Sequence, residues 1–185
     1  MSLSPITKRQ VHRKRISDRL GTGMIAAAWI VLLGLLTVYF NGWLREQENP
    51  NQHPLGTRTE TGAYEVVLAQ NRQGHYMATG TINGHPVQFL LDTGATTVSV
   101  STDLAESLQL PIGPASTAWT ANGTITTYHT RLDEVRIGNI LLHDVRATIN
   151  PHMHIEAILL GMSFLKQIEF TQRGDTLTLR QFRTE

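Results

Sequence analysis

The sequence predicts a predominantly β domain that follows one membrane-spanning helix. Three observations support this prediction: a long uncharged apolar run near the N-terminus, a polar segment after it, and short β-like runs bounded by turn-forming residues. The chain has 185 residues, which is room for one ordinary domain with appendages. It contains no cysteine, so disulfide scaffolds, thiolate metal sites and cysteine nucleophiles are excluded.

The uncharged run covers residues 20–44, and its centre, Met24–Phe40, reads MIAAAWIVLLGLLTVYF. A helix over the run is about 37 Å long at about 1.5 Å per residue, which is enough to cross a hydrocarbon core of about 30 Å. We therefore predict a transmembrane helix at 20–44. Because Lys and Arg gather in residues 1–19, we expect this N-terminal segment to lie in the cytoplasm.

Two other interpretations of the apolar run are a cleaved signal peptide and a buried core helix. The small residues Ala26, Ala27 and Ala28 lie inside the run, and no A-x-A-like cleavage site follows it. A core helix of a soluble domain would show a polar face, which this run lacks. Both features favour an uncleaved anchor.

The charge of the chain differs between its two parts. The whole chain has 16 basic and 15 acidic side chains and a net charge of +1, which gives no argument for a nucleic-acid partner. Residues 1–61 hold eight basic and four acidic side chains, so they carry +4 and the remainder carries −3. Residues 45–62 are polar and are interrupted by Pro50 and Pro54, which predicts a flexible linker to a folded domain at 63–185.

The region after Ala63 shows the pattern of a β domain. Runs of alternating or continuous apolar residues predict strands at Tyr64–Ala69, His75–Ile82, Val87–Leu91, Thr124–Thr130, Val135–Ile137, Leu141–Ile149, Ile158–Leu160, Ile168–Thr171 and Thr176–Arg180. Hairpin turns are predicted at Asn83-Gly84, Asn122-Gly123, Gly138-Asn139 and Arg173-Gly174-Asp175. Helices are predicted at Thr102–Leu108, capped by Ser101 or Thr102, and over a short turn at Met162–Lys166.

One segment combines features that suit catalysis. The apolar strand Val87–Leu91 runs directly into Asp92, Thr93 and Gly94, which delivers a carboxylate to the end of a buried strand. Glycine permits close backbone approach, so the Gly94 N–H can point at the carboxylate. Two further elements follow: Thr120–Thr124 (TANGT), which predicts a tight hairpin tip, and Ile158–Gly161 (ILLG), which predicts an apolar strand ending on glycine.

The order and spacing of these three elements resemble those of the retropepsin-like aspartic proteases over residues of about 64 to 181. The stretches DTGATTV, TANG and LLGMSFL are most similar to the bacterial, membrane-anchored members of that family. The resemblance implies an all-β, single-lobed closed barrel with one or two short helices. It also implies a bacterial inner-membrane protein with a periplasmic catalytic domain, a peptide or protein substrate, and no cofactor or metal.

The resemblance further implies a role for each matching residue. Asp92 would be the catalytic carboxylate, supported by Thr93 in a grip between two subunits, by backbone contacts of Gly94 and by Ala95, which matches the retroviral form of the motif. The flap, which binds substrate, would contain Trp119, Thr120, Ala121, Asn122 and Gly123, and the segment packed beside the catalytic loop would be Leu159, Leu160 and Gly161. The chain departs from retroviral members at Met162 and Ser163, where they commonly have an arginine and a carboxylate or amide.

A single D-T-G motif predicts that the active protein has two copies of the chain. Peptide hydrolysis by this mechanism needs one carboxylate to accept a proton from water and a second, protonated carboxyl group to donate a hydrogen bond to the scissile carbonyl. The other aspartates of the domain lack the motif's context, so a homodimer with two Asp92 side chains at its axis is expected.

Two alternatives remain open at the level of sequence. The domain could be a catalytically silent retropepsin-like module that dimerises or binds peptides, with Asp92 acting only as a turn cap. It could instead bind a metal through His152 and His154, although no H-E-x-x-H motif occurs. A serine hydrolase is not supported, because no G-x-S-x-G motif occurs.

Overall fold

The structure is a computed structural model that describes residues 9–120 and 123–182. The chain divides into two compact units, Met1–Leu44 and Arg45–Glu185. The first unit is built from helix α1 (Arg9–Glu48), which continues into the start of the second unit. The second unit holds all the strands and two short helices.

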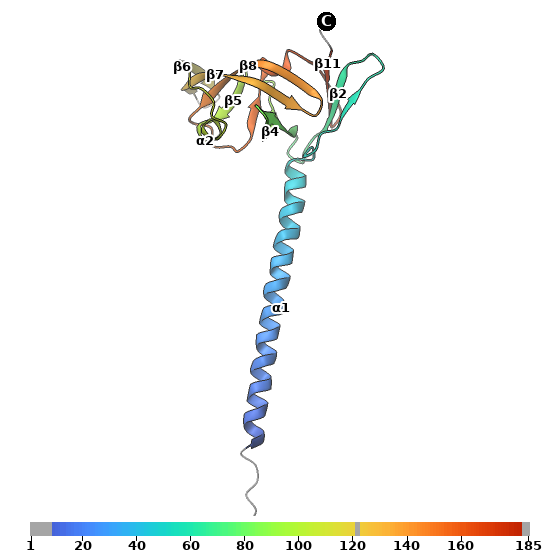
Figure 1. The fold of residues 1–185 in the computed structure, drawn as a ribbon, viewed down its shortest axis with the longest axis vertical. Coiled ribbons are helices and arrows are strands. Elements are labelled where there is room, and N and C mark those ends of the chain that lie inside the picture. Colours follow the sequence, from blue (N-terminus) through green and yellow to red (C-terminus); the bar gives the residue numbers. More distant parts are fainter. Residues whose placement is uncertain (1–8, 121–122, 183–185) are drawn as a thin grey trace, which may run out of the picture. The chain divides into compact units, whose positions relative to one another are not determined.

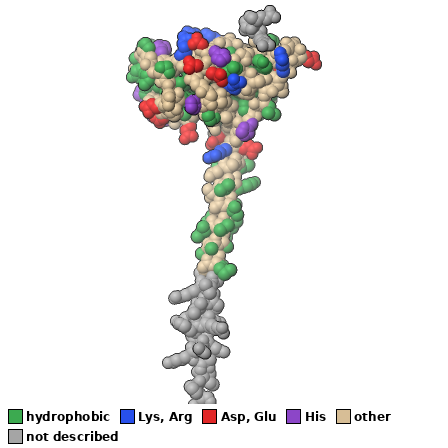
Figure 2. Space-filling model, viewed as in Figure 1, with side chains coloured by type: hydrophobic (Ala, Val, Ile, Leu, Met, Phe, Trp, Pro, Cys, Tyr) green, Lys and Arg blue, Asp and Glu red, His purple; other side chains and the backbone are tan. Residues whose placement is uncertain are grey.

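Helix α1 contains a stretch, Gly23–Glu48, that is long and apolar enough to cross a membrane. Its side chains from residue 23 to residue 44 are exposed. On the face seen in Figure 2, residues 23–44 show hydrophobic side chains and no charged group. The helix extends beyond the predicted 20–44 at both ends, because hydropathy marks only the apolar run while backbone hydrogen bonding continues through polar helix-forming residues.

The main sheet of the second unit closes into a barrel. Its strands are β3 (Met77–Ile82), β4 (His85–Leu91), β5 (Val98–Ser101), β6 (Ala115–Thr120), β7 (Gly123–Ile137), β8 (Ile140–Asn150) and β9 (Ile158–Leu160). Their order is β3-β4-β9-β5-β8-β7-β6, and β3 also pairs with β7, which closes the sheet (Figure 1). The predicted closed, mostly β fold is therefore confirmed.

A second, four-stranded sheet packs onto the same core. Its order is β1 (Gly56–Arg58), β2 (Tyr64–Ala69), β11 (Thr176–Gln181) and β10 (Glu169–Arg173), and all its pairings are antiparallel. The inner face of the central strands is apolar and buried, with Val66, Leu68 and Leu179 fully inaccessible. Strand β10 lies at the edge of the sheet, and every one of its residues is exposed.

Two short helices complete the second unit. Helix α2 (Thr102–Ser107) begins after Ser101, whose side chain accepts a hydrogen bond from the Leu104 N–H, as expected of an N-cap. Helix α3 (Met162–Leu165) begins directly after β9 and buries Phe164 and Leu165 in the core.

Most predicted strands are confirmed, and the errors have identifiable causes. The strands at Tyr64–Ala69 and Ile158–Leu160 have the predicted bounds, and the hairpin turns at Asn83-Gly84 and Gly138-Asn139 join the expected strands. The two strands predicted at 124–130 and 135–137 are one strand, β7, because the polar residues between them still pair with β8. Strands β1, β5 and β6 were not predicted, since they are short or rich in Ser, Thr and Ala.

The expected flexible linker at 45–62 does not hold for residues 49–58, which are part of the folded unit. Asn51 is buried, and its Nδ2 donates to the carbonyl oxygens of Ala69 (2.9 Å) and Met77 (2.6 Å) while its Oδ1 accepts from the Ala69 N–H (2.8 Å). Asn49 is also buried and donates to Thr79 Oγ1, and strand β1 pairs with β2. Composition misleads here because an asparagine amide can satisfy backbone groups that the sheets leave unpaired.

We predict that Asn51→Ala destabilises the second unit by roughly 2 kcal/mol, because it removes three part-buried hydrogen bonds to the backbone of Ala69 and Met77. The measurement is chemical denaturation of the full chain in detergent, monitored by Trp fluorescence. His53→Ala serves as the control, since His53 is exposed. Equal stability of the two variants would contradict the docking of this segment.

Candidate active site

Asp92 lies directly after β4, in a loop that begins where β4 pairs in parallel with β9. Leu91 is in register with Leu160, and the Asp92 N–H donates to the Leu160 carbonyl (3.2 Å). The Gly94 N–H donates to Asp92 Oδ1 (2.8 Å), and the Ala95 N–H donates to the Asp92 carbonyl (3.3 Å). The hydrogen bond expected from Gly94 is therefore present, and it fixes one carboxylate oxygen over a tight turn.

The Asp92 side chain is half-buried and faces a depression of about 240 Å³. Its lining is largely apolar and comes from both sheets and α3: Tyr76, Leu91, Asp92, Thr93, Leu165, Phe170, Gln172 and Leu177. Six of these residues, Tyr76, Leu91, Leu165, Phe170, Gln172 and Leu177, were not predicted from the sequence as site residues. Phe170 offered one signal, since it is an aromatic residue in a strand whose other members are polar.

Gly161 allows the catalytic loop to pack against the end of β9 and the start of α3. A Cβ at this position would lie 2.3 Å from the Thr97 carbonyl oxygen and 2.6 Å from the Ala95 carbonyl oxygen, so only glycine fits. The next two N–H groups bind the same loop: Met162 donates to the Ala95 carbonyl (2.8 Å), and Ser163 donates to the Thr96 carbonyl (3.0 Å). The structure thus brings Leu160 and Gly161 beside the loop that carries Asp92.

Ser163, one of the two departures noted in the sequence, ties this loop to β8. Its buried hydroxyl accepts a hydrogen bond from the Val98 N–H (2.9 Å) and donates one to the Arg146 carbonyl (2.7 Å). A small hydroxyl therefore occupies the position where retroviral members commonly have a larger carboxylate or amide side chain.

The expected flap is the hairpin of β6 and β7. Trp119 pairs with Thr124 and Thr120 pairs with Gly123 at its end, while Ala121 and Asn122 lie outside the described residues. Trp119 is 87% exposed and is not part of the lining of the Asp92 depression. The hairpin is thus present, with its aromatic side chain open to solvent.

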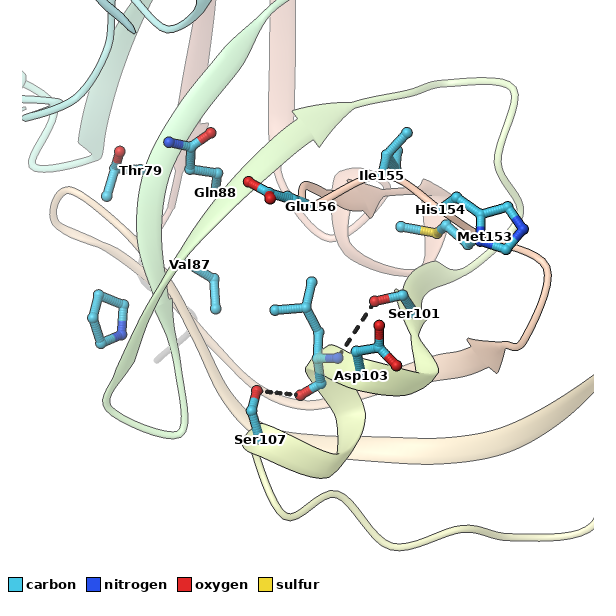
Figure 3. A pocket seen from close by; sticks show the side chains of 12 residues that line it. Thr79, Val87, Gln88, Ser101, Asp103, Ser107, Met153, His154, Ile155 and Glu156 are labelled. Atoms are coloured by element: carbon cyan, nitrogen blue, oxygen red, sulfur yellow. Dashed lines mark hydrogen bonds between the residues drawn. The ribbon is translucent and has the colours of Figure 1, made fainter. Parts of the chain in front are cut away.

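Another cavity of the second unit, of about 740 Å³, is shown in Figure 3, and Asp92 is not among its lining residues. It lies between β4, α2 and the loop before β9, and Figure 3 shows the Glu156 carboxylate directed toward Gln88. Asp103 from the first turn of α2 is a second acidic group in its lining. None of its lining residues is shared with the depression that contains Asp92.

The metal-site alternative finds no ligand set in the part of the chain that the structure describes. No three His, Asp or Glu side chains among those residues are grouped so that they could hold a metal ion. His152 and His154 are both exposed, and only the backbone N–H of His152 has a hydrogen bond, to Asn150 Oδ1.

Comparison with known proteins agrees with this geometry. Residues 78–167 match the family described as "gag-polyprotein putative aspartyl protease". The crystal structure of a retropepsin-like aspartic protease from Rickettsia conorii is similar, with 26% sequence identity and a TM-score of 0.57 over 64% of this chain and 92% of that chain. The chain belongs to the retropepsin-like aspartic protease family. The match over residues 78–167 includes the loop that carries Asp92, the β6–β7 hairpin and Gly161.

Two curated proteins are also similar to this retropepsin-like chain. An uncharacterized protein in the cobV 5′ region of Sinorhizobium sp is 34% identical over 178 residues, which is 88% of this chain and 75% of that protein. An uncharacterized Rickettsia prowazekii protein is 27% identical over 117 residues, which is 60% of this chain and 48% of that protein. The first similarity extends beyond the β unit into the N-terminal part of the chain.

We predict that Gly161→Ala lowers stability by roughly 3 kcal/mol or more, because the added methyl group meets two backbone carbonyls that cannot move without displacing the catalytic loop. Gly174→Ala is the control: it has φ 56° but open space around it, so only the conformational penalty of roughly 1 kcal/mol is expected. Chemical denaturation of both variants measures the difference. A Gly161→Ala protein as stable as the control would disprove the close approach.

Proposed function

We propose that the protein is a membrane-anchored aspartic endopeptidase that acts as a homodimer. The observation that carries this proposal is the Asp92 carboxylate, half-buried after β4 and oriented by the Gly94 N–H, in a fold of the retropepsin-like family. Residues Thr93, Gly94 and Ala95 form the loop that supports it, and Leu159, Leu160 and Gly161 pack beside that loop.

The chemistry needs two carboxyl groups and one water molecule. Two carboxylates at about 3 Å share one proton, because both cannot readily ionise at that separation. The ionised Asp92 accepts a proton from water as the water oxygen attacks the scissile carbonyl carbon, while the protonated Asp92 of the partner subunit donates a hydrogen bond to the carbonyl oxygen. The tetrahedral intermediate then collapses: the C–N bond breaks, the amine takes a proton from the dyad, and a carboxylic acid is released. No covalent enzyme intermediate forms.

The second copy has a suitable surface at β10. This strand ends the order β1-β2-β11-β10, and within the described residues it pairs only with β11, so its other edge has free backbone donors and acceptors. Phe170 lies on the inner face of the sheet and is 36% exposed where it lines the Asp92 depression. A symmetric partner at this edge would cover Phe170 and bring its own Asp92 to the same depression.

The membrane topology follows from the distribution of charge along the chain. The helix that is apolar enough to span a membrane is preceded by a cluster of Lys and Arg, which favours a cytoplasmic N-terminus. The β unit would then lie in the periplasm of a bacterial inner membrane. Confinement to a membrane raises the effective concentration of two weakly associating copies.

The substrate in this proposal is an extended peptide. Such a peptide can lie beneath the β6–β7 hairpin and exchange backbone hydrogen bonds with it, as an added strand does. Trp119 and the residues from Thr120 to Gly123 would contact the substrate when the hairpin closes, and the exposed indole of Trp119 is available for that contact.

A catalytically silent, peptide-binding module is the second candidate function. One observation favours it: Asp92 Oδ1 already accepts a hydrogen bond from the N–H two residues on, which is the geometry of a simple turn cap. The two candidates differ in whether the carboxylate performs chemistry.

We predict that Asp92→Asn lowers peptide cleavage by roughly 10²- to 10⁴-fold, because an amide cannot accept the proton from water. Asn keeps the side-chain oxygen that binds the Gly94 N–H, so the fold should be retained. The assay uses the full chain in detergent micelles and a decapeptide library over about pH 3 to 7, with products identified by mass spectrometry. Asp175→Asn, in the exposed turn between β10 and β11, is the control of equal charge and should cleave normally.

Two outcomes would contradict the protease assignment. Cleavage by Asp92→Asn at the wild-type rate would show that another group or a contaminant is responsible. Binding of library peptides without cleavage by the wild type, at protein concentrations high enough to form dimers, would favour the silent module.

We predict that Phe170→Glu weakens the dimer, because it places a charge against the apolar lining of the Asp92 depression. At a given protein concentration, the specific activity of the variant should be lower than that of the wild type. It should also increase more steeply as the protein concentration is raised, because more of the variant is monomeric. Sedimentation of the chain in detergent measures the monomer–dimer equilibrium directly. Thr171→Glu, the next residue on the same strand, points to the opposite face and should have a smaller effect. An unchanged equilibrium in Phe170→Glu would place the dimer contact elsewhere.

A further inference from the structure

A cavity of about 430 Å³ lies at the end of the catalytic loop and contains two arginines. Thr97 from that loop, Arg131 from β7 and Arg146 from β8 are among its lining residues. Thr97 follows Asp92 by five residues, and a chain of five residues reaches at most about 17 Å. Because an extended peptide advances about 3.3 Å per residue, a substrate side chain within roughly five residues of the scissile bond can reach this cavity.

The wall of the cavity opposite β8 is held in place by hydrogen bonds. The segment Pro111–Gly113 runs along β7: the Gly113 N–H donates to the His129 carbonyl (2.8 Å), and Thr130 Oγ1 donates to the Pro111 carbonyl (2.7 Å). Ile112 in this segment also lines the cavity and is 67% exposed. The cavity thus combines a fixed apolar wall with basic side chains from the neighbouring strands.

The charge of the lining has one sign. His129, Arg131 and Arg146 are its ionisable members, and no acidic side chain is among them. Arg131 and Arg146 are directly opposite each other in the β7–β8 register, an arrangement of like charges that is unfavourable without an anion. Asp144 forms an ion pair with Arg131. Within the described residues, the Arg146 guanidinium has no hydrogen-bond or ion-pair partner, so it is available to a ligand.

The end of the catalytic loop is tied to the strand that carries Arg146. Thr97 Oγ1 and Thr148 Oγ1 are 3.1 Å apart, and Ser163 bonds both Val98 and the Arg146 carbonyl. The position of Arg146 relative to Thr97 is therefore fixed by hydrogen bonds. A carboxylate bound there would be held in register with the reacting bond.

We propose that this cavity is a specificity subsite for an acidic side chain of the substrate, with Arg146 as its main contact and Ile112 packing on the methylene groups. The inference rests on the proposed protease function. The guanidinium group can bind a carboxylate through two parallel hydrogen bonds and an ion pair, whereas an amide of equal size is neutral and has only one acceptor oxygen. Glutamate suits the cavity because it combines a carboxylate with an apolar stem.

The test compares matched peptides. The starting peptide is the library decapeptide that the full chain in detergent cleaves fastest, and Glu, Gln or Lys is placed in turn at each of the second to fifth residues on either side of the cleaved bond. At one of these positions, we expect kcat/KM for the Glu peptide to be about fivefold or more higher than kcat/KM for the Gln peptide. The preference should shrink as salt is raised from about 0.05 to 0.5 M, since the site is exposed.

The variants assign the preference to the cavity. Arg146→Gln should remove the preference, so that the Glu and Gln peptides have similar kcat/KM values, and Arg146→Lys should keep part of it. Arg136→Gln makes the same charge change on the neighbouring strand β7, outside the cavity, and should leave the preference intact. The subsite would be overturned if no position showed a preference for Glu. It would also be overturned if Arg146→Gln lowered cleavage of the Glu peptide and of the Gln peptide by the same factor.

A separate measurement distinguishes failure of the subsite from failure of the protease assignment. If the wild type cleaves no peptide, fluorescein-labelled decapeptide pools with fixed Glu or fixed Gln are tested for binding to the full chain by fluorescence polarisation. Tighter binding of the Glu pool that disappears in Arg146→Gln supports the subsite without proteolysis. Equal binding of the two pools overturns it.

Discussion

The close packing of Gly161 against the catalytic loop is the constraint on which the site depends. The loop must turn sharply after β4, and its carbonyl groups at Ala95, Thr96 and Thr97 then face the start of α3. Because Gly161 has no side chain, the N–H groups of Met162 and Ser163 reach the carbonyls of Ala95 and Thr96 and hold them. The loop that carries Asp92 is thus held in place by a segment far away in the sequence, mainly through backbone contacts.

Barrel closure relies on a similar absence of a side chain. At Gly80 in β3, a Cβ would lie 2.1 Å from the Arg136 carbonyl oxygen of β7, so the pairing that closes the sheet also requires glycine. The barrel therefore has close backbone contacts both where it closes and where it carries the site. The second sheet differs, since β10 leaves an apolar inner face uncovered beside Asp92.

The sequence allowed prediction of features that depend on local pattern. Asp92, Gly94 and Gly161 were found because a motif and its spacing are visible in one dimension, and long strands were found because their burial alternates. Residues that act through tertiary contacts were missed. Asn51 and Phe170 have ordinary neighbours in sequence, and only the folded chain shows that Asn51 bonds two strands and that Phe170 lies beside the Asp92 carboxylate. Strand β6 was missed because Ser, Thr and Ala carry little hydrophobic signal, and β5 was missed because its alternation of Val and Ser covers only four residues.

The docking of residues 49–58 has a consequence for release of the β unit from helix α1. A cut before Asn49 preserves the side-chain contacts of Asn49 and Asn51 with β2 and β3, as well as strand β1. A cut after Asn51 separates this asparagine from the β unit, which then loses the hydrogen bonds from Asn51 to Ala69 and Met77. Shedding by another protease would therefore yield a durable soluble form only when the cleavage site lies within a few residues of the helix end.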